Sequence, residues 1–178
     1  MGIDVGWAGS SDFGTVIVDW RDNKLNVIYE NAIKSPLMKD VRALIHKLIQ
    51  QYSICRVYSD GSSVVLNNQL AKDYNENIQW HLLDEETRTQ LLRGVSCRSP
   101  LINPVNFRTH GKYMLERLHQ VVSTHQIRID PERFPKTVIS LKTAVNKQGD
   151  LWALDKINTS HDDVIDALRL IMNSLQVQ

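Results

Sequence analysis

Two aspartates lie in apolar surroundings where a charged side chain needs an explanation. Asp4 is the centre of the segment Gly-Ile-Asp-Val-Gly at residues 2–6, and Asp60 follows the run Val-Tyr-Ser at residues 57–59. Burying an unpaired carboxylate costs several kcal/mol, so each aspartate needs a partner, a metal ion or a place at a strand end. Each also fits a plain turn residue, because aspartate readily hydrogen-bonds loop amides and Asp-Gly is a common turn.

A third group of acids lies near the C-terminus, in the segment 160–170. Asp163 and Asp166 are three residues apart and therefore share one face of a helix. The alternative is that Ser160 caps this helix while Asp162 and Asp163 complement its dipole. Asp166 fits that alternative less well, because it lies beyond the first few residues and is repelled by both acids. A separate apolar stripe on the same helix consists of Val164, Ile165, Leu168, Ile171, Met172 and Leu175.

Carboxylates that converge from two strand ends and a helix repel one another unless cations neutralise them. Ligation by oxygen alone suits Mg²⁺ or Mn²⁺. Two such ions about 3.5 to 4 Å apart can activate a water molecule and stabilise the leaving oxygen when a phosphodiester bond is hydrolysed. The acids therefore predict metal-dependent phosphodiester chemistry, in which the protein mainly supplies position and charge.

The first elements that must position these acids are strands. Residues 2–7, 15–20 and 25–32 have strand character, and the turn-prone connections between them are short. This pattern predicts an antiparallel meander. Apolar residues at helical spacing predict an amphipathic helix over 37–52.

A parallel crossover follows the meander. A strand at 56–59 ends at Asp60, a helix covers 64–74, and another strand lies at 78–83. If the first and fourth strands are neighbours, Asp4 and Asp60 face each other across the sheet. The two acids then need only the C-terminal helix to complete the group.

The second half of the chain adds further helices and short strands. The polar, arginine-bearing segment 84–104 is interpreted as a helix or an irregular segment that is followed by a loop. Together with the first half, these elements predict an α/β fold with a mixed sheet flanked by helices. The remaining expected elements are a helix at 109–123, an extended segment at 126–129, a helix at 136–145, a turn at 148–150, a strand at 151–156 and a final helix.

Composition limits the class of protein. A chain of 178 residues with 42% hydrophobic content fits one domain over residues 1–178. Cys55 and Cys97 are too few for a disulfide framework, which favours a reducing, cytosolic setting. No apolar run approaches the roughly 18 to 20 residues that span a bilayer. We therefore expect a soluble protein without a membrane partner.

The net charge of the chain does not by itself indicate a nucleic-acid partner. Lys and Arg total 21 against 20 Asp and Glu, so any basic surface must be local. A cluster of basic residues in the most polar part of the chain is the candidate for contact with DNA phosphates, although such a run also fits a solvated face. Its members are Arg88, Arg93, Arg98, Arg108 and Lys112.

These motifs, in this order, resemble the C-terminal nuclease domain of the large terminase subunit of tailed phages and related viruses. The resemblance rests on residues 2–6 followed by Ser11 and Asp12, on residues 58–61, and on the segment 161–168, which is the most specific. It covers nearly the whole chain. That family has a ribonuclease H-like fold close to the RuvC-type Holliday junction resolvases.

The resemblance implies that Asp4, Asp60 and Asp163 bind two catalytic Mg²⁺ or Mn²⁺ ions, with Asp166 as a fourth ligand. Asp162 competes with Asp163 for the ligand role, because the adjacent acids leave the register open. The first-loop acid Asp12 and the helix-start residue His161 are candidates for supporting roles. Asp12 also fits a turn residue, and His161 also fits a solvent-facing position.

The resemblance further implies an endonuclease that cuts double-stranded concatemeric DNA during viral genome packaging, in the cytoplasm of an infected host cell. The expected partners are a packaging ATPase domain preceding this one in a longer chain, a small terminase subunit and a portal. No Gly-x-x-x-x-Gly-Lys-Ser/Thr phosphate loop is present, so ATP-driven translocation is not assigned to these residues.

Three rival readings remain open. Residues 2–6 also resemble the opening of the actin-like kinases and ATPases, which need a second lobe for which 178 residues leave no room. A Holliday junction resolvase would share the acids and would prefer branched DNA. A non-enzymatic DNA-binding or assembly module would keep the fold without binding divalent ions.

Overall fold

A six-stranded mixed sheet in the order β5-β4-β1-β2-β3-β6 forms the centre of the computed structural model, which describes residues 1–5, 12–74, 86–87 and 100–174. The strands β1, β2 and β3 are the predicted antiparallel meander. The pairs β1–β4, β4–β5 and β3–β6 are parallel, so the predicted mixed sheet is confirmed. The strands are β1 (Gly2–Val5), β2 (Phe13–Arg21), β3 (Lys24–Ile33), β4 (Arg56–Asp60), β5 (Leu101–Val105) and β6 (Ile127–Arg128).

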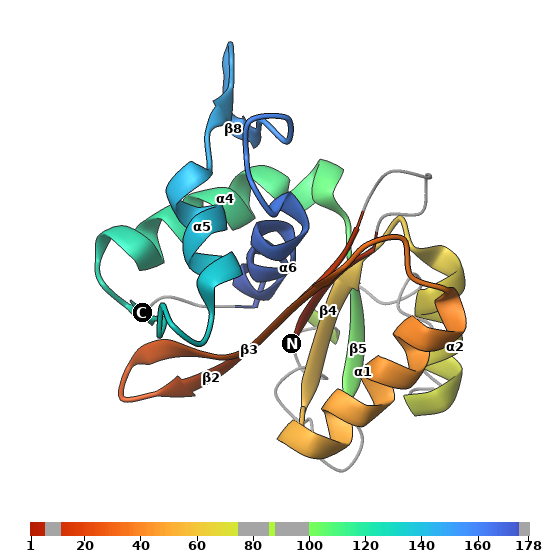
Figure 1. Ribbon diagram of the computed structural model, residues 1–178. Coiled ribbons are helices and arrows are strands. Elements are labelled where there is room, and N and C mark those ends of the chain that lie inside the picture. Colours follow the sequence, from red (N-terminus) through yellow and green to blue (C-terminus); the bar gives the residue numbers. More distant parts are fainter. Residues whose placement is uncertain (6–11, 75–85, 88–99, 175–178) are drawn as a thin grey trace.

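Helices cover both faces of this sheet (Figure 1). The helices α1 (Met38–Tyr52) and α2 (Val64–Tyr74) lie on one face. The other face carries α4 (Phe107–Ser123), α5 (Pro135–Thr143) and α6 (Asp162–Met172). Among the described residues, no helix has both the length and the apolar character needed to cross a bilayer.

Side-chain alternation along the central strands decides which residues face α6. Ile3 belongs to the core on the α1 and α2 side, whereas a Cβ added at Gly2 would meet the backbone of α6. Val57 likewise packs on the α1 side and Tyr58 on the α6 side. Because successive strand residues point to opposite faces, the even-numbered positions of both strands lie toward α6.

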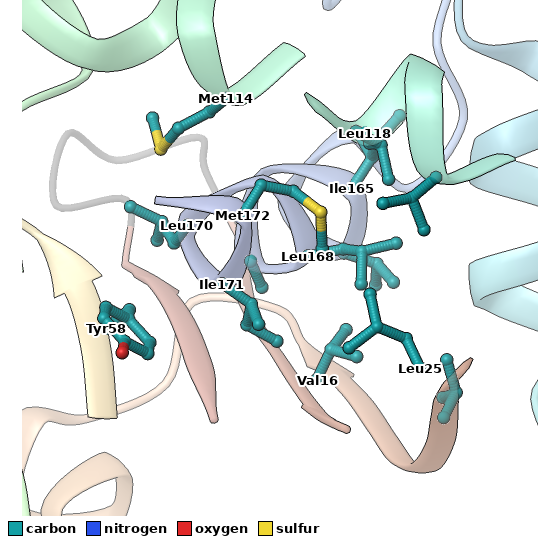
Figure 2. Close-up of a cluster of buried hydrophobic side chains, with 14 of the residues drawn as sticks. Val16, Leu25, Tyr58, Met114, Leu118, Ile165, Leu168, Leu170, Ile171 and Met172 are labelled. Carbon is teal, nitrogen blue, oxygen red and sulfur yellow. The ribbon is translucent and has the colours of Figure 1, made fainter. Parts of the chain in front are cut away.

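The helix α6 is buried on all sides. Every residue from Asp163 to Met172 is buried, and Figure 2 shows Leu168, Ile171 and Met172 between the sheet and α4. The prediction of a single apolar stripe on this helix is therefore too narrow. The helix fills the space between the sheet and the outer helices α4 and α5, so its acids are buried as well as its aliphatic residues.

Two glycines allow α6 to lie directly against the sheet. A Cβ at Gly2 would be 1.8 Å from the carbonyl oxygen of Ala167, and a Cβ at Gly14 would be 2.2 Å from that of Asp163. Gly14 is also the β2 partner of Asp4. The absence of a side chain at Gly14 therefore allows the start of α6 to lie beside Asp4.

Gly14→Ala should lower the free energy of unfolding by about 2 kcal/mol, because the new methyl group forces the start of α6 away from β2. Urea unfolding followed by circular dichroism measures this change. Gly111→Ala is the matched control, since its Cβ would come no closer than 3.5 Å to the Arg169 side chain. It should be neutral or stabilising by up to about 1 kcal/mol, because alanine favours a helix over glycine. Equal effects of the two substitutions would refute the close-approach explanation.

Several boundaries differ from the prediction. The strand β5 occupies residues that were predicted to be loop, while the predicted strand at 78–83 lies outside the described residues. The predicted strand at 151–156 is one arm of a separate hairpin, β7 (Asn146–Lys147) and β8 (Asp150–Leu154), which projects from the molecule (Figure 1). Cys55 is disulfide-bonded, which the sequence analysis did not predict, and Cys97 lies outside the described residues.

Candidate active site

A cleft of about 570 Å³ lies on the α6 side of the sheet and brings together three of the predicted acids, each from a different element. Asp4 comes from β1, Asp60 from the end of β4, and Asp166 from α6. The three were predicted to meet, and they line the same cleft. The other lining residues are Phe107, Arg108, Gly111, Lys112, Asp150, Ala153, Leu154, Lys156 and Arg169.

Asp166 is held between two cations. It is 2% exposed, and its Oδ1 accepts a hydrogen bond of 2.6 Å from Nη1 of Arg169. Its Oδ2 lies 2.7 Å from Nζ of Lys156. Nη2 of Arg169 donates to the carbonyl oxygen of Gly111 at 3.1 Å, and its guanidinium lies over the ring of Phe107. Arg169 therefore anchors Asp166 from the interior, while Lys156 contacts it from the solvent side.

Asp4 is the acid that most needs a counter-charge. It is 6% exposed, and burial is the largest cause that raises its pKa well above the ordinary aspartate value. The charges of Asp166, Asp163 and Asp60 raise the pKa further, and Lys156 opposes them. A carboxylate in this position favours a bound cation, because neutralisation removes both the repulsion and the burial penalty.

Asp163 lies beside the cleft and is not one of its lining residues. Burial, together with the charges of Asp162 and Asp12, raises its pKa to about 7. Asp162 is less buried and lies 3.8 Å from Nζ of Lys156. The charge of the first-loop acid Asp12 acts on both Asp162 and Asp163. The choice between Asp162 and Asp163 as a ligand stays a prediction.

Asp60 combines a turn with a place in the cleft. Its Oδ1 accepts a hydrogen bond of 3.0 Å from the backbone N–H of Ser62, and the Ser62 hydroxyl donates to Oδ2. The side-chain amide of Asn67 donates to the Asp60 carbonyl at 2.8 Å. The turn that the sequence allowed as an alternative is thus present, and it holds the carboxylate at the cleft wall.

Of the predicted DNA-contacting residues, Arg108 and Lys112 line the cleft from α4. Arg88, Arg93 and Arg98 lie outside the described residues. His161 is exposed in the left-handed conformation before α6 and makes no side-chain capping bond.

The sequence analysis missed the two cations that contact Asp166. Arg169 follows Asp166 by one helical turn, a spacing that favours an ion pair and could have indicated it. Lys156 has no comparable local signal. It reaches Asp166 because the chain returns to α6 after β8, which only the tertiary structure shows.

The chemistry of the donor set fits a hard divalent cation. Asp4, Asp60 and Asp166 offer only carboxylate oxygens, as Mg²⁺ and Mn²⁺ prefer. Among residues 1–5, 12–74, 86–87 and 100–174, however, no three acidic, histidine or cysteine side chains are arranged to hold one ion. The acids thus share a cleft without forming a closed set of ligands.

The architecture of this sheet and its helices is ribonuclease H-like, as predicted. The nuclease domain of the g2p large terminase from bacteriophage SPP1, a crystal structure with bound Mn, has a similar fold. That comparison has a TM-score of 0.63 and 18% sequence identity, and it covers 97% of this chain and 83% of the SPP1 chain. The sequence matches no protein-family model and no curated protein. The structural similarity confirms the fold on which the predicted resemblance depends.

Proposed function

We propose that this chain is a metal-dependent endonuclease of the terminase kind, which hydrolyses phosphodiester bonds of double-stranded DNA. The observation that carries the proposal is the meeting of Asp4, Asp60 and Asp166 in one cleft of a ribonuclease H-like fold. The similar SPP1 domain is a nuclease whose crystal structure contains Mn. The same fold with acids gathered in one cleft supports the same class of reaction here.

In this proposal the acids hold two divalent cations, Mg²⁺ or Mn²⁺. Asp4, Asp60 and Asp166 supply ligand oxygens from the cleft, and Asp163 or Asp162 adds one from the start of α6. Bound cations would activate a water molecule and stabilise the leaving oxygen of the cleaved bond. The protein itself positions these ligands: β1 and β4 fix the carboxylates of Asp4 and Asp60, and Arg169 fixes that of Asp166.

The cations of α4 are proposed to hold the DNA backbone. Arg108 and Lys112 lie on the wall of the cleft and carry charge toward any phosphate that enters it. Contacts of this kind position a duplex without reading its sequence. We further propose that the domain acts beside a packaging ATPase, a small terminase subunit and a portal in the infected cell, where it cuts concatemeric DNA.

Cleavage of supercoiled plasmid in Mn²⁺, in Mg²⁺ and in EDTA tests the proposed function. We expect nicked and linear DNA with either metal and intact plasmid in EDTA. Branched DNA in the same assay tests for a resolvase, which would cut junctions in preference to linear duplex. Intact DNA under every condition, together with no Mn²⁺ binding by calorimetry, would leave a non-enzymatic module as the better description.

A further inference from the structure

Lys156 is the one described residue outside α6 whose side chain forms an ion pair with Asp166. Its Nζ lies 2.7 Å from Oδ2 of Asp166 and 3.8 Å from Oδ2 of Asp162. Oδ1 of Asp166 already accepts a hydrogen bond from Arg169. Both oxygens of Asp166 are therefore engaged, Oδ1 by Arg169 and Oδ2 by Lys156, and a bound cation would have to compete for one of them.

The charge of Lys156 reaches beyond this ion pair. Lys156 also interacts electrostatically with Asp4 on β1 and with Asp163 at the start of α6, which are both buried. One ammonium group thus partly neutralises carboxylates from β1 and from α6. Neutralising several carboxylates at once is the task that the proposed function gives to a divalent cation.

The side chains of Arg169 and Lys156, which both contact Asp166, differ in how easily they can move away from it. The Arg169 side chain is 6% exposed and its guanidinium is fixed by Gly111 and Phe107. The Lys156 side chain is 58% exposed, and it ends in a flexible, strongly hydrated ammonium group. Its backbone is held nearby, because the N–H of Asp155 donates to the carbonyl oxygen of Val145 at 2.8 Å. Lys156 can therefore swing away from Asp166 without unpacking the core.

We propose that Lys156 is a built-in counter-ion, which occupies the carboxylate cleft of the metal-free chain and is displaced from Asp166 when a divalent cation binds. The proposal rests on the proposed metal-dependent function. It accounts for the finding that the described acids share a cleft without forming a group ready to hold an ion. Lys156 then stabilises the acids of the cleft when no cation is bound, and it weakens their affinity for metal.

Titration of Mn²⁺ into the full chain by calorimetry, with Lys156→Met beside the parent, tests this role. Removing the competing ammonium should tighten Mn²⁺ binding by about tenfold, because one unit charge near the ligand oxygens no longer opposes the metal. Lys156→Met should also melt at a lower temperature than the parent in EDTA, and Mn²⁺ should raise its melting temperature by more. Lys147→Met, which removes one exposed charge from the hairpin that precedes Lys156, should leave Mn²⁺ affinity unchanged.

The outcomes separate this inference from the function on which it rests. If the parent binds Mn²⁺ and Lys156→Met binds it equally or more weakly, Lys156 is no competitor and the inference is overturned alone. A purely structural salt bridge would give that result, with lower stability in EDTA and no gain in affinity. If neither protein binds Mn²⁺, the proposed function fails and the inference fails with it.

Discussion

Asp4→Asn should reduce metal-dependent DNA cleavage by about 1,000-fold, equivalent to roughly 4 kcal/mol of transition-state stabilisation. It should do so without unfolding the protein. Asp4 is 6% exposed, and burial with the nearby Asp166 charge raises its pKa well above the usual value. The neutral amide keeps the shape of the side chain and removes this repulsion. The metal-free variant should therefore be as stable as the parent or more stable.

Plasmid cleavage and thermal unfolding in EDTA, measured on the same preparations, separate a lost ligand from a lost fold. Asp40→Asn is the matched control, because Asp40 is exposed in the first turn of α1 on the opposite face of the sheet. It should leave cleavage unchanged. Full activity of Asp4→Asn would remove Asp4 from the proposed ligand set, and a large loss of stability would show that its charge supports the fold instead.

The sheet was predictable because its strands carry local signals. Short turns linked three extended segments, and these became β1, β2 and β3 in the predicted antiparallel order. The strand β5 gave no such signal. It contains Asn103 and Pro104 within five residues, and these depress strand propensity, but parallel pairing with β4 overrides that local preference.

The candidate site was predictable only in part. Asp4, Asp60 and Asp166 are acids in apolar contexts, and alternation along β1 and β4 places the first two on the face that α6 covers. The burial of α6 on every side was not predictable from its apolar stripe, because that depends on α4 and α5 packing over it. The contact of Lys156 with Asp166 depends on the path of the chain between β8 and α6.

Arg169→Met should lower the free energy of unfolding by about 3 kcal/mol, because it leaves a buried carboxylate without its interior partner. Asp166 is 2% exposed and accepts a 2.6 Å hydrogen bond from Arg169. The effect falls at the lower end of the range for broken buried pairs, since Lys156 still contacts the other oxygen. Urea unfolding measures the loss.

Arg117→Met is the matched control for this loss. Arg117 lies on α4, where its guanidinium contacts the ring of Tyr113 in solvent, and its removal should cost less than about 1 kcal/mol. Adding Asp166→Leu to Arg169→Met should restore most of the stability, because no charge is then left buried. If Arg169→Met costs no more than Arg117→Met, Arg169 does not hold Asp166 in place. The position of Asp166 in the cleft would then depend on the packing of α6 and on Lys156.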